Sequence, residues 1–371
     1  MRTAALLLSL LCMPLQAALV SDLYTASVAV DGRNNAARAS GVKDGLEQVL
    51  VRITGNNGVG QTAAGKSIIA RADNYLLTYS FQSGEQTNLQ VRFDPVKLQQ
   101  QVRESGLPIW GSQRPVTLHW LAVADELMPL QLVNELADDG EQLNAIAQRR
   151  GLPQLLPILD LEDNLAVSAN DVLGNFPEPV LRASARYGGD FVLLSSVQQF
   201  DGQWHYQMYL YDGQPQQDGA PLPMALAQHR GVVDSRSAAL EQVLAATASY
   251  YAGRYGAVAS DATAGADNQV VFELDGGIDQ LVELERYLVS LAPVQQTAVV
   301  AVNGNRITLA LQLIGGLNEF QQLLSLESRV ELLQLSDPLQ PPSLLPPEAS
   351  PVPEQAPSAA ANLPHYRWLN Q

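Results

Sequence analysis

One stretch of the sequence has the spacing of a catalytic motif: residues 60–67, which read GQTAAGKS. This stretch fits the phosphate-binding P-loop at every fixed position, and Lys66 would then contact the phosphates of a nucleotide. A P-loop also needs a buried strand that runs directly into its first glycine. Residues 35–54 instead have the apolar spacing of a helix, and residues 56–59 intervene before Gly60. The sequence therefore favours a capped surface helix with Lys66 in solvent, and a P-loop hydrolase is the weaker alternative.

A second group of reactive side chains is the acidic cluster of Asp160, Glu162 and Asp163, which follows the apolar residues 155–159. We expect those apolar residues to form a strand. Carboxylates at a strand end can bind a hard cation when further oxygen ligands converge on it. On a chain with 38 acidic and 22 basic residues, a solvated loop is the competing interpretation. The cluster is thus a candidate site for a cation or a small ligand, with no metal ligand set assigned.

The other reactive residue types show no catalytic spacing. The four histidines are far apart in sequence, and we expect His119 and His205 to be partly exposed histidines in strands. Ser195 and Ser196 lack the Gly-x-Ser-x-Gly turn that presents the serine of many hydrolases. The sequence therefore selects no catalytic residue and implies no cofactor, and we expect a protein that is not an enzyme.

The first 17 residues have the pattern of a secretory signal peptide. A short basic start is followed by an apolar run too brief to span a bilayer, and Ala17 stands at the expected cleavage position. Cys12 is the one cysteine of the chain and would leave with this peptide, so we expect no disulfide. We predict a periplasmic protein without a membrane span after cleavage, and an uncleaved anchor is the alternative. The formal charge of −16 repels phosphate backbones, so nucleic-acid binding is not expected.

Hydrophobic periodicity divides the chain into several small units of the α+β class. After the signal peptide at 1–17, we expect an N-terminal α+β domain at 18–112, a central α/β domain at 113–258, a ferredoxin-like βαββαβ domain at 268–336, a Pro-rich linker at 337–362 and an aromatic tail at 363–371. The best specified unit is 177–213, in which a helix that opens with proline precedes two strands joined at Asp201-Gly202.

The aromatic tail has two interpretations. Tyr366 and Trp368 flank Arg367 and would share one face of an extended segment. Two large aromatic side chains in a short extended peptide are typical of strand addition or groove binding, so the tail is a candidate partner-binding segment. The alternative is that the tail folds back and pairs with an edge strand of its own protein.

Several segments resemble a proteobacterial family known as domain of unknown function 2066. They are residues 23–28, 49–56, 106–111, 120–123 and 156–163. The resemblance extends over most of the mature chain to about Leu335, and it implies a Gram-negative periplasmic protein without an assigned activity.

More distantly, residues 183–211 resemble the amino-terminal domain of the translocation protein TolB, although no propeller repeats follow them. That resemblance implies a module that docks proteins in the cell envelope. The leading hypothesis from the sequence is thus a non-enzymatic protein that binds or scaffolds other envelope proteins. A small-ligand or cation-binding protein and a P-loop hydrolase are the alternatives.

Overall fold

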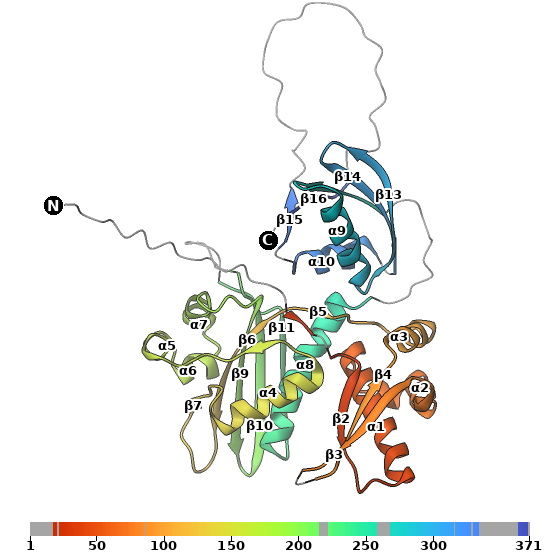
Figure 1. Cartoon of the computed structure of the whole chain (residues 1–371). Helices are drawn as coiled ribbons and strands as arrows, with labels where there is room; N and C mark the ends of the chain where they lie inside the picture. Colours follow the sequence, from red (N-terminus) through yellow and green to blue (C-terminus); the bar gives the residue numbers. More distant parts are fainter. Residues whose placement is uncertain are drawn as a thin grey trace, which may run out of the picture.

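The computed structural model describes residues 18–20, 22–84, 86–214, 222–257, 268–314, 316–327, 329–333 and 363–369. The chain is of the α+β class, with helices packed on several separate sheets (Figure 1). The expected signal peptide and Pro-rich linker lie outside the described residues. Within the described residues, no helix is long and apolar enough to cross a membrane.

The elements follow one another in three groups, which are called the N-terminal, central and C-terminal units below. The first contains β1 (Ala18–Leu19), β2 (Thr25–Ala29), α1 (Asn35–Thr54), η1 (Val59–Gln61), α2 (Ala63–Ala70), η2 (Ala72–Asn74), β3 (Leu76–Gln82), β4 (Asn88–Phe93), α3 (Pro95–Glu104) and β5 (Gln113–Arg114). The second contains β6 (Thr117–Ala124), β7 (Gln131–Leu132), α4 (Asp138–Arg150), β8 (Gln154–Leu155), α5 (Leu161–Ala166), α6 (Ala169–Leu173), α7 (Pro177–Ser184), β9 (Phe191–Phe200), β10 (Gln203–Asp212), β11 (Ala227–Val233) and α8 (Arg236–Tyr255). The third contains β12 (Gln269–Leu274), α9 (Ile278–Ser290), β13 (Val294–Asn303), β14 (Arg306–Leu313), α10 (Leu317–Leu324), β15 (Val330–Leu333) and β16 (His365–Trp368).

The N-terminal unit is a three-stranded antiparallel sheet, in the order β2-β4-β3, with α1 packed on one face. The prediction of a helix at 35–54 is confirmed, because local signals define both of its ends. The side chain of Asn34 accepts a hydrogen bond from the Ala37 amide at 2.8 Å. At the other end, Gly55 has a φ of 64° and donates its amide to the Val51 carbonyl. The second face of this sheet is polar.

The central unit is a six-stranded sheet in which β6 lies parallel to β9. Strands β10 and β11 follow β9 as an antiparallel meander. Helices α4 and α8 cover one face, and α5 to α7 lie over part of the other (Figure 1). The predicted hairpin is confirmed, with φ of 51° at Asp201 and 73° at Gly202. The predicted strand at 155–159 is wrong: β8 ends at Leu155, because Pro157 has no amide for a ladder and Leu159 turns the chain with a φ of 56°.

His119 is another place where the structure differs from the sequence prediction. Its ring lies completely inside the central unit, between β6 and the helices α4 and α8. Nε2 lies 2.6 Å from the Ser195 hydroxyl, and burial lowers the pKa of His119 to about 4. The histidine is therefore neutral at pH 7, and partial exposure was the wrong expectation. His205 is exposed.

This buried histidine makes the stability dependent on pH. Between pH 6.5, its ordinary pKa, and about 4, the unfolded chain binds the proton that the folded chain excludes. The folded state therefore loses stability as the pH falls through this window. We expect the parent to lose about 2 kcal/mol more than His119→Gln between about pH 7 and about pH 5, measured by urea unfolding. His205 lies at an exposed site, so His205→Gln should keep the parent's dependence of stability on pH. Equal dependence of stability on pH in His119→Gln and His205→Gln would contradict this assignment.

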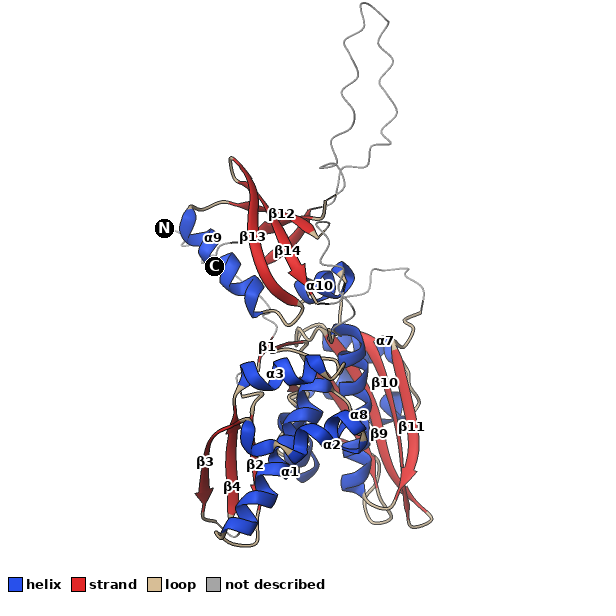
Figure 2. Ribbon diagram, turned by 90° about the vertical axis from the view of Figure 1, so that its right-hand side faces the viewer, coloured by secondary structure: helices blue, strands red, loops and turns tan. Residues whose placement is uncertain are grey.

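The C-terminal unit is a five-stranded sheet in the order β13-β14-β12-β16-β15. Helices α9 and α10 pack on one face of this sheet (Figure 2). The βαββαβ order predicted from the sequence is present, yet β12 and β15 are not neighbours as they would be in a ferredoxin-like sheet. The strand at His365–Trp368 lies between them. The sheet of this unit thus includes residues beyond the expected range 268–336.

Candidate functional site

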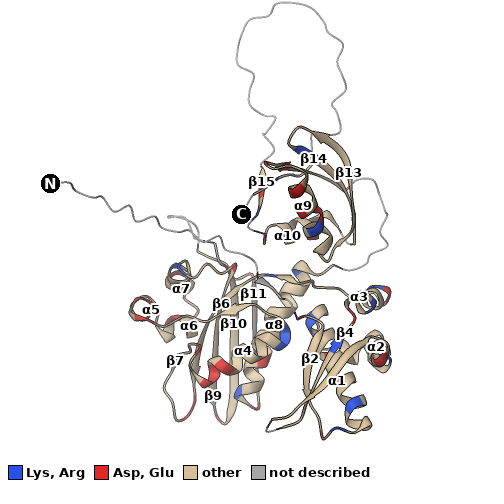
Figure 3. Cartoon of the chain, in the orientation of Figure 1, with Lys and Arg blue, Asp and Glu red and all other residues tan. Residues whose placement is uncertain are grey.

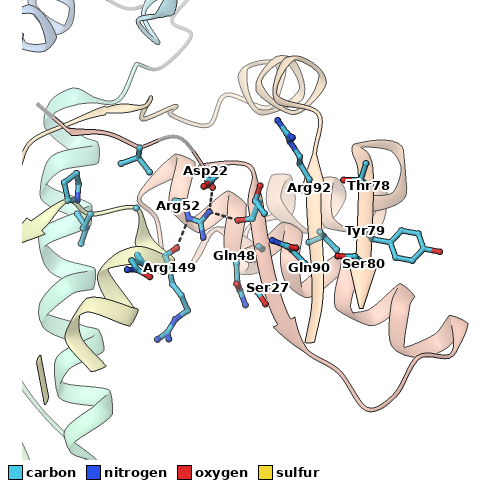
Figure 4. A pocket seen from close by; sticks show the side chains of 18 residues that line it. Asp22, Ser27, Gln48, Arg52, Thr78, Tyr79, Ser80, Gln90, Arg92 and Arg149 are labelled. Carbon is cyan, nitrogen blue, oxygen red and sulfur yellow. Dashed lines mark hydrogen bonds between the residues drawn. The ribbon is translucent and has the colours of Figure 1, made fainter. Parts of the chain in front are cut away.

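A groove of about 960 Å³ lies between the polar face of the N-terminal sheet and the end of α4 (Figure 4). One wall is formed by strands β2, β4 and β3. The other consists of the last turn of α4 and the residues after it. The two walls present polar and charged side chains to the groove. They include Asp22, Thr25, Ser27, Arg52, Thr78, Ser80, Gln90, Arg92, Gln148 and Arg149.

The polar wall follows from the alternation of side chains along the three strands. Ala26, Val28, Leu89 and Val91 point to the core under α1, so their neighbours in sequence point into the groove. Strand register then aligns these neighbours in two rows, Thr25-Arg92-Thr78 and Ser27-Gln90-Ser80. The rows offer hydroxyl and amide groups that both donate and accept hydrogen bonds.

The charges along the groove are mostly positive, whereas charged residues elsewhere are spread over all three units (Figure 3). Arg149 pairs with Glu241 on α8, and Arg52 is bound to carbonyl groups. Arg92 is exposed and has no hydrogen-bond or ion-pair partner among the described residues. The groove therefore holds one basic side chain that is available to an anionic group.

Arg52 joins the two walls of the groove. Its Nη1 donates to the carbonyls of Asp22 and Thr25 at 2.9 and 2.7 Å, and its Nε donates to the Arg149 carbonyl at 2.8 Å (Figure 4). The first two carbonyls lead into β2, and the third belongs to the end of α4. Burial lowers the pKa of Arg52, and the negative ends of the helix dipoles favour a cation here. The position of the groove thus depends on this contact.

Arg114 lies deeper in the contact between the end of α1 and the end of α4, which is called the joint below, and it is completely buried. Its guanidinium donates to five carbonyls, those of Arg52, Trp110, Gly111, Arg150 and Gly151, at 2.8 to 3.1 Å. It also lies 3.8 Å from the centre of the Trp110 ring. Burial, with the neighbouring Arg52 cation, lowers the pKa of Arg114 to about 9, so the group is charged at neutral pH. Two helix ends and a loop are held by one side chain.

Three of the five segments quoted above for the DUF2066 resemblance, residues 23–28, 49–56 and 106–111, lie at this joint. Residues 49–56 supply Arg52, and residues 106–111 supply three backbone contacts: Trp110 donates to the Ile53 carbonyl, and Ile109 exchanges two hydrogen bonds with Ala257. A methyl group on Gly55 would lie 2.1 Å from Ala252 of α8. The sequence reasoning recognised these segments but missed their role and missed Arg114. An arginine in a two-residue strand such as β5 carries no sequence signal of burial.

The P-loop pattern has a different geometry in the structure. Residues 60–67 begin inside the turn η1, which follows helix α1 rather than a strand, and Lys66 is exposed on α2. The Thr62 hydroxyl accepts the Gly65 amide at 3.0 Å and caps α2. A side chain on Gly65 would lie 1.9 Å from the Val59 carbonyl, which explains the glycine by packing. The preference for a capped surface helix is confirmed.

Lys66→Ala should leave stability unchanged within about 0.5 kcal/mol, because Lys66 lies on the solvent side of a capped helix. Urea unfolding of the two proteins measures this. ATP binding by the purified protein, lost in Lys66→Ala, would contradict the assignment.

The acidic cluster surrounds a cationic side chain of the same chain, Arg186. Arg186 contacts Asp160 at 2.7 Å and both Glu162 and Asp163 at 3.3 Å. The hydrogen bond from Arg186 holds the pKa of Asp160 down to about 2. Asp163 is buried and also accepts the Tyr187 hydroxyl and the Leu159 amide. The structure thus brings the three predicted residues together around the Arg186 guanidinium. Asp160 also caps the start of α5.

The two aromatic residues of the tail lie inside the C-terminal unit. Tyr366 is 3 % exposed and Trp368 1 %. Of the two placements that the sequence left open, the structure shows the tail folded back on its own protein. Its strand lies inside the sheet rather than at an edge.

Comparison with known proteins gives matches to two family models and to solved structures. The sequence model of a domain of unknown function, DUF8605, matches residues 17–111. No curated protein matches. The C-terminal domain of LpoB from Salmonella enterica aligns at 19 % identity with a TM-score of 0.22, over 33 % of this chain and 83 % of that chain. The family model of DUF2066 matches residues 265–338, which confirms the resemblance there. The segments quoted above for that resemblance lie outside this stretch, and residues 23–28, 49–56 and 106–111 lie in the DUF8605 match.

Proposed function

We propose that the protein is an exported, non-enzymatic binding protein of the cell envelope, and that its groove holds an extended acidic segment of another envelope protein. The signal-peptide pattern of residues 1–17 supports the location. The binding role rests on Arg92, which lies on the polar wall of the groove. Its side chain is exposed and has no partner among the described residues.

The shape of the polar wall favours an extended segment. The two rows, Thr25-Arg92-Thr78 and Ser27-Gln90-Ser80, are two residues apart along each strand. An extended chain repeats its side chains on one face every two residues, about 6.5 Å apart, so alternate side chains can face successive rows. Hydroxyl and amide groups can pair with the backbone and the side chains of such a segment.

The charges favour an acidic segment. Three arginines and one aspartate line the groove of a chain whose formal charge is −16. The rest of the molecule repels acidic partners, so the groove is a local region of attraction. A partner held by Arg92 should dissociate as salt screens the exposed charge.

A photo-crosslinking amino acid tests this proposal in intact cells. Placed at Ser80, in the second row of the groove, it should give a defined protein adduct. Placed at Gln100, an exposed position on α3 outside the groove, it should not. Adducts of equal yield at both positions would contradict a binding role for the groove.

Charge reversal distinguishes an acidic partner from any other. Arg92→Glu should reduce the Ser80 adduct about tenfold, corresponding to about 1.4 kcal/mol, whereas Arg92→Lys should retain most of it. Both variants should unfold within about 0.5 kcal/mol of the parent, since Arg92 is exposed. An unchanged adduct in Arg92→Glu would show that the partner is not recognised by its charge.

A further inference from the structure

The strand β16 fills a slot between two other strands of the C-terminal unit. It pairs in parallel with β12 and antiparallel with β15. Backbone hydrogen bonds continue at both ends, from the Val271 amide to the Pro364 carbonyl at 2.9 Å and from the Leu369 amide to the Arg329 carbonyl at 2.8 Å. The tail is thus bound as a peptide is bound by strand addition, with partners on both sides.

The side chains of the slot bind the two aromatic residues of the tail. Tyr366 stacks on Phe272 of β12, with ring centroids 5.3 Å apart. Trp368 packs on Tyr287 of α9 at 5.3 Å, and the Arg329 guanidinium lies 4.7 Å from its ring. These contacts come from residues at least 39 positions away in sequence. The slot therefore recognises the tail by its chemistry and not by its connection to the preceding chain.

The connection itself is far longer than the pairing requires. Leu333 and His365 are direct register partners on adjacent antiparallel strands. Residues 334–364 lie between them, 31 residues in all, where a hairpin loop needs about 2–5. Relative to a loop of about four residues, loop-closure entropy lowers the local concentration of the tail at the slot by about 20-fold.

We propose that this slot exchanges its strand, and that the second occupant is the tail of another copy of this chain. The tail of a second copy carries the same residues and makes every contact described above. The long connection lets the tail leave its own slot without strain on β15. The chain's own tail is present at a local concentration of about a millimolar, so the closed monomer dominates at micromolar concentration and exchange grows as copies are concentrated.

Paired cysteines test this exchange directly. Glu331 and Arg367 are register partners with exposed side chains on the open face of the sheet, at a separation that a disulfide can bridge. One protein carries Glu331→Cys and another Arg367→Cys, both with Cys12→Ser. Neither can close an internal disulfide. After mixing under mild oxidation, we expect a disulfide between the two chains, with a yield that rises from about 10 µM to about 500 µM protein.

Two controls set the background. The double variant Glu331→Cys with Arg367→Cys should close within one chain when dilute, which verifies the register. A mixture of Lys66→Cys and Arg367→Cys, with Lys66 exposed on α2, measures random collision. The second register pair, Leu333→Cys with His365→Cys, repeats the test if the first pair perturbs the fold. Interchain yield equal to the Lys66 background with both pairs would overturn the proposal and show that the slot holds only its own tail.

Discussion

Trp368→Ala is expected to lower the free energy of unfolding of the C-terminal unit by about 3–5 kcal/mol, the range for truncating a large buried aromatic side chain. Trp368 is 1 % exposed and packs on Tyr287, beneath the Arg329 guanidinium. The substitution leaves a cavity between α9 and the sheet, and the four-residue strand has few other contacts to hold it in the slot. Removal of residues 363–371 should cost more, because β12 and β15 then lose their shared partner.

Urea unfolding combined with hydrogen exchange of β12 and β14 measures this effect in the full chain. Leu332→Ala is the matched control, since Leu332 is the register partner of Tyr366 but is 62 % exposed. It should change stability by no more than about 0.5 kcal/mol. Equal stability of parent and Trp368→Ala would mean that the tail does not occupy the slot in solution.

The tail shows where sequence reasoning stops. The alternation of Tyr366 and Trp368 predicted that both share one face, and the structure places both on the side of the sheet that α9 covers. Periodicity, however, says which face is apolar and not which strand is the neighbour. The partners of β16 are β12, more than 90 residues earlier, and β15, beyond a proline-rich stretch. A pairing at such separation has no local signal, so only the structure could place it.

Elements with local signals were predicted well. Helix α1 begins and ends where Asn34 and Gly55 indicate, and the Asp201-Gly202 turn joins the strands expected. The strand predicted at 155–159 was wrong because an apolar run was weighed above Pro157.

The groove could not be predicted at all. Its two walls come from β2 to β4 and from the end of α4, and hydrogen bonds from Arg52 and Arg114 join them. Both arginines are surface residues by type, and their partners are backbone carbonyls, which no side-chain pattern reveals. The helix at 35–54 was predicted, and so was an α+β domain at 18–112. The contacts of Arg52 and Arg114, which position the N-terminal unit relative to the central unit, could not be predicted.

Arg114→Ala is therefore the most informative change at that joint, and it should destabilise the protein by at least about 3 kcal/mol. The substitution leaves five carbonyls without their donor in a buried site, and each buried acceptor that loses a charged donor costs about 1–3 kcal/mol, with costs that do not simply add. Water entering the cavity would recover part of this loss. Arg114→Lys keeps the charge but cannot reach five acceptors from one ammonium, so it should restore stability only partly.

Arg92→Ala is the matched control, because Arg92 lies at the same groove but is exposed and unpartnered among the described residues. Urea unfolding of the three variants should rank Arg92→Ala with the parent, Arg114→Lys below it and Arg114→Ala lowest. Hydrogen exchange gives a second measurement: the ends of α1 and α4 should lose protection in Arg114→Ala, since their last carbonyls are the groups that the guanidinium holds. Full protection at both helix ends, with stability equal to Arg92→Ala, would show that the two units are joined without Arg114.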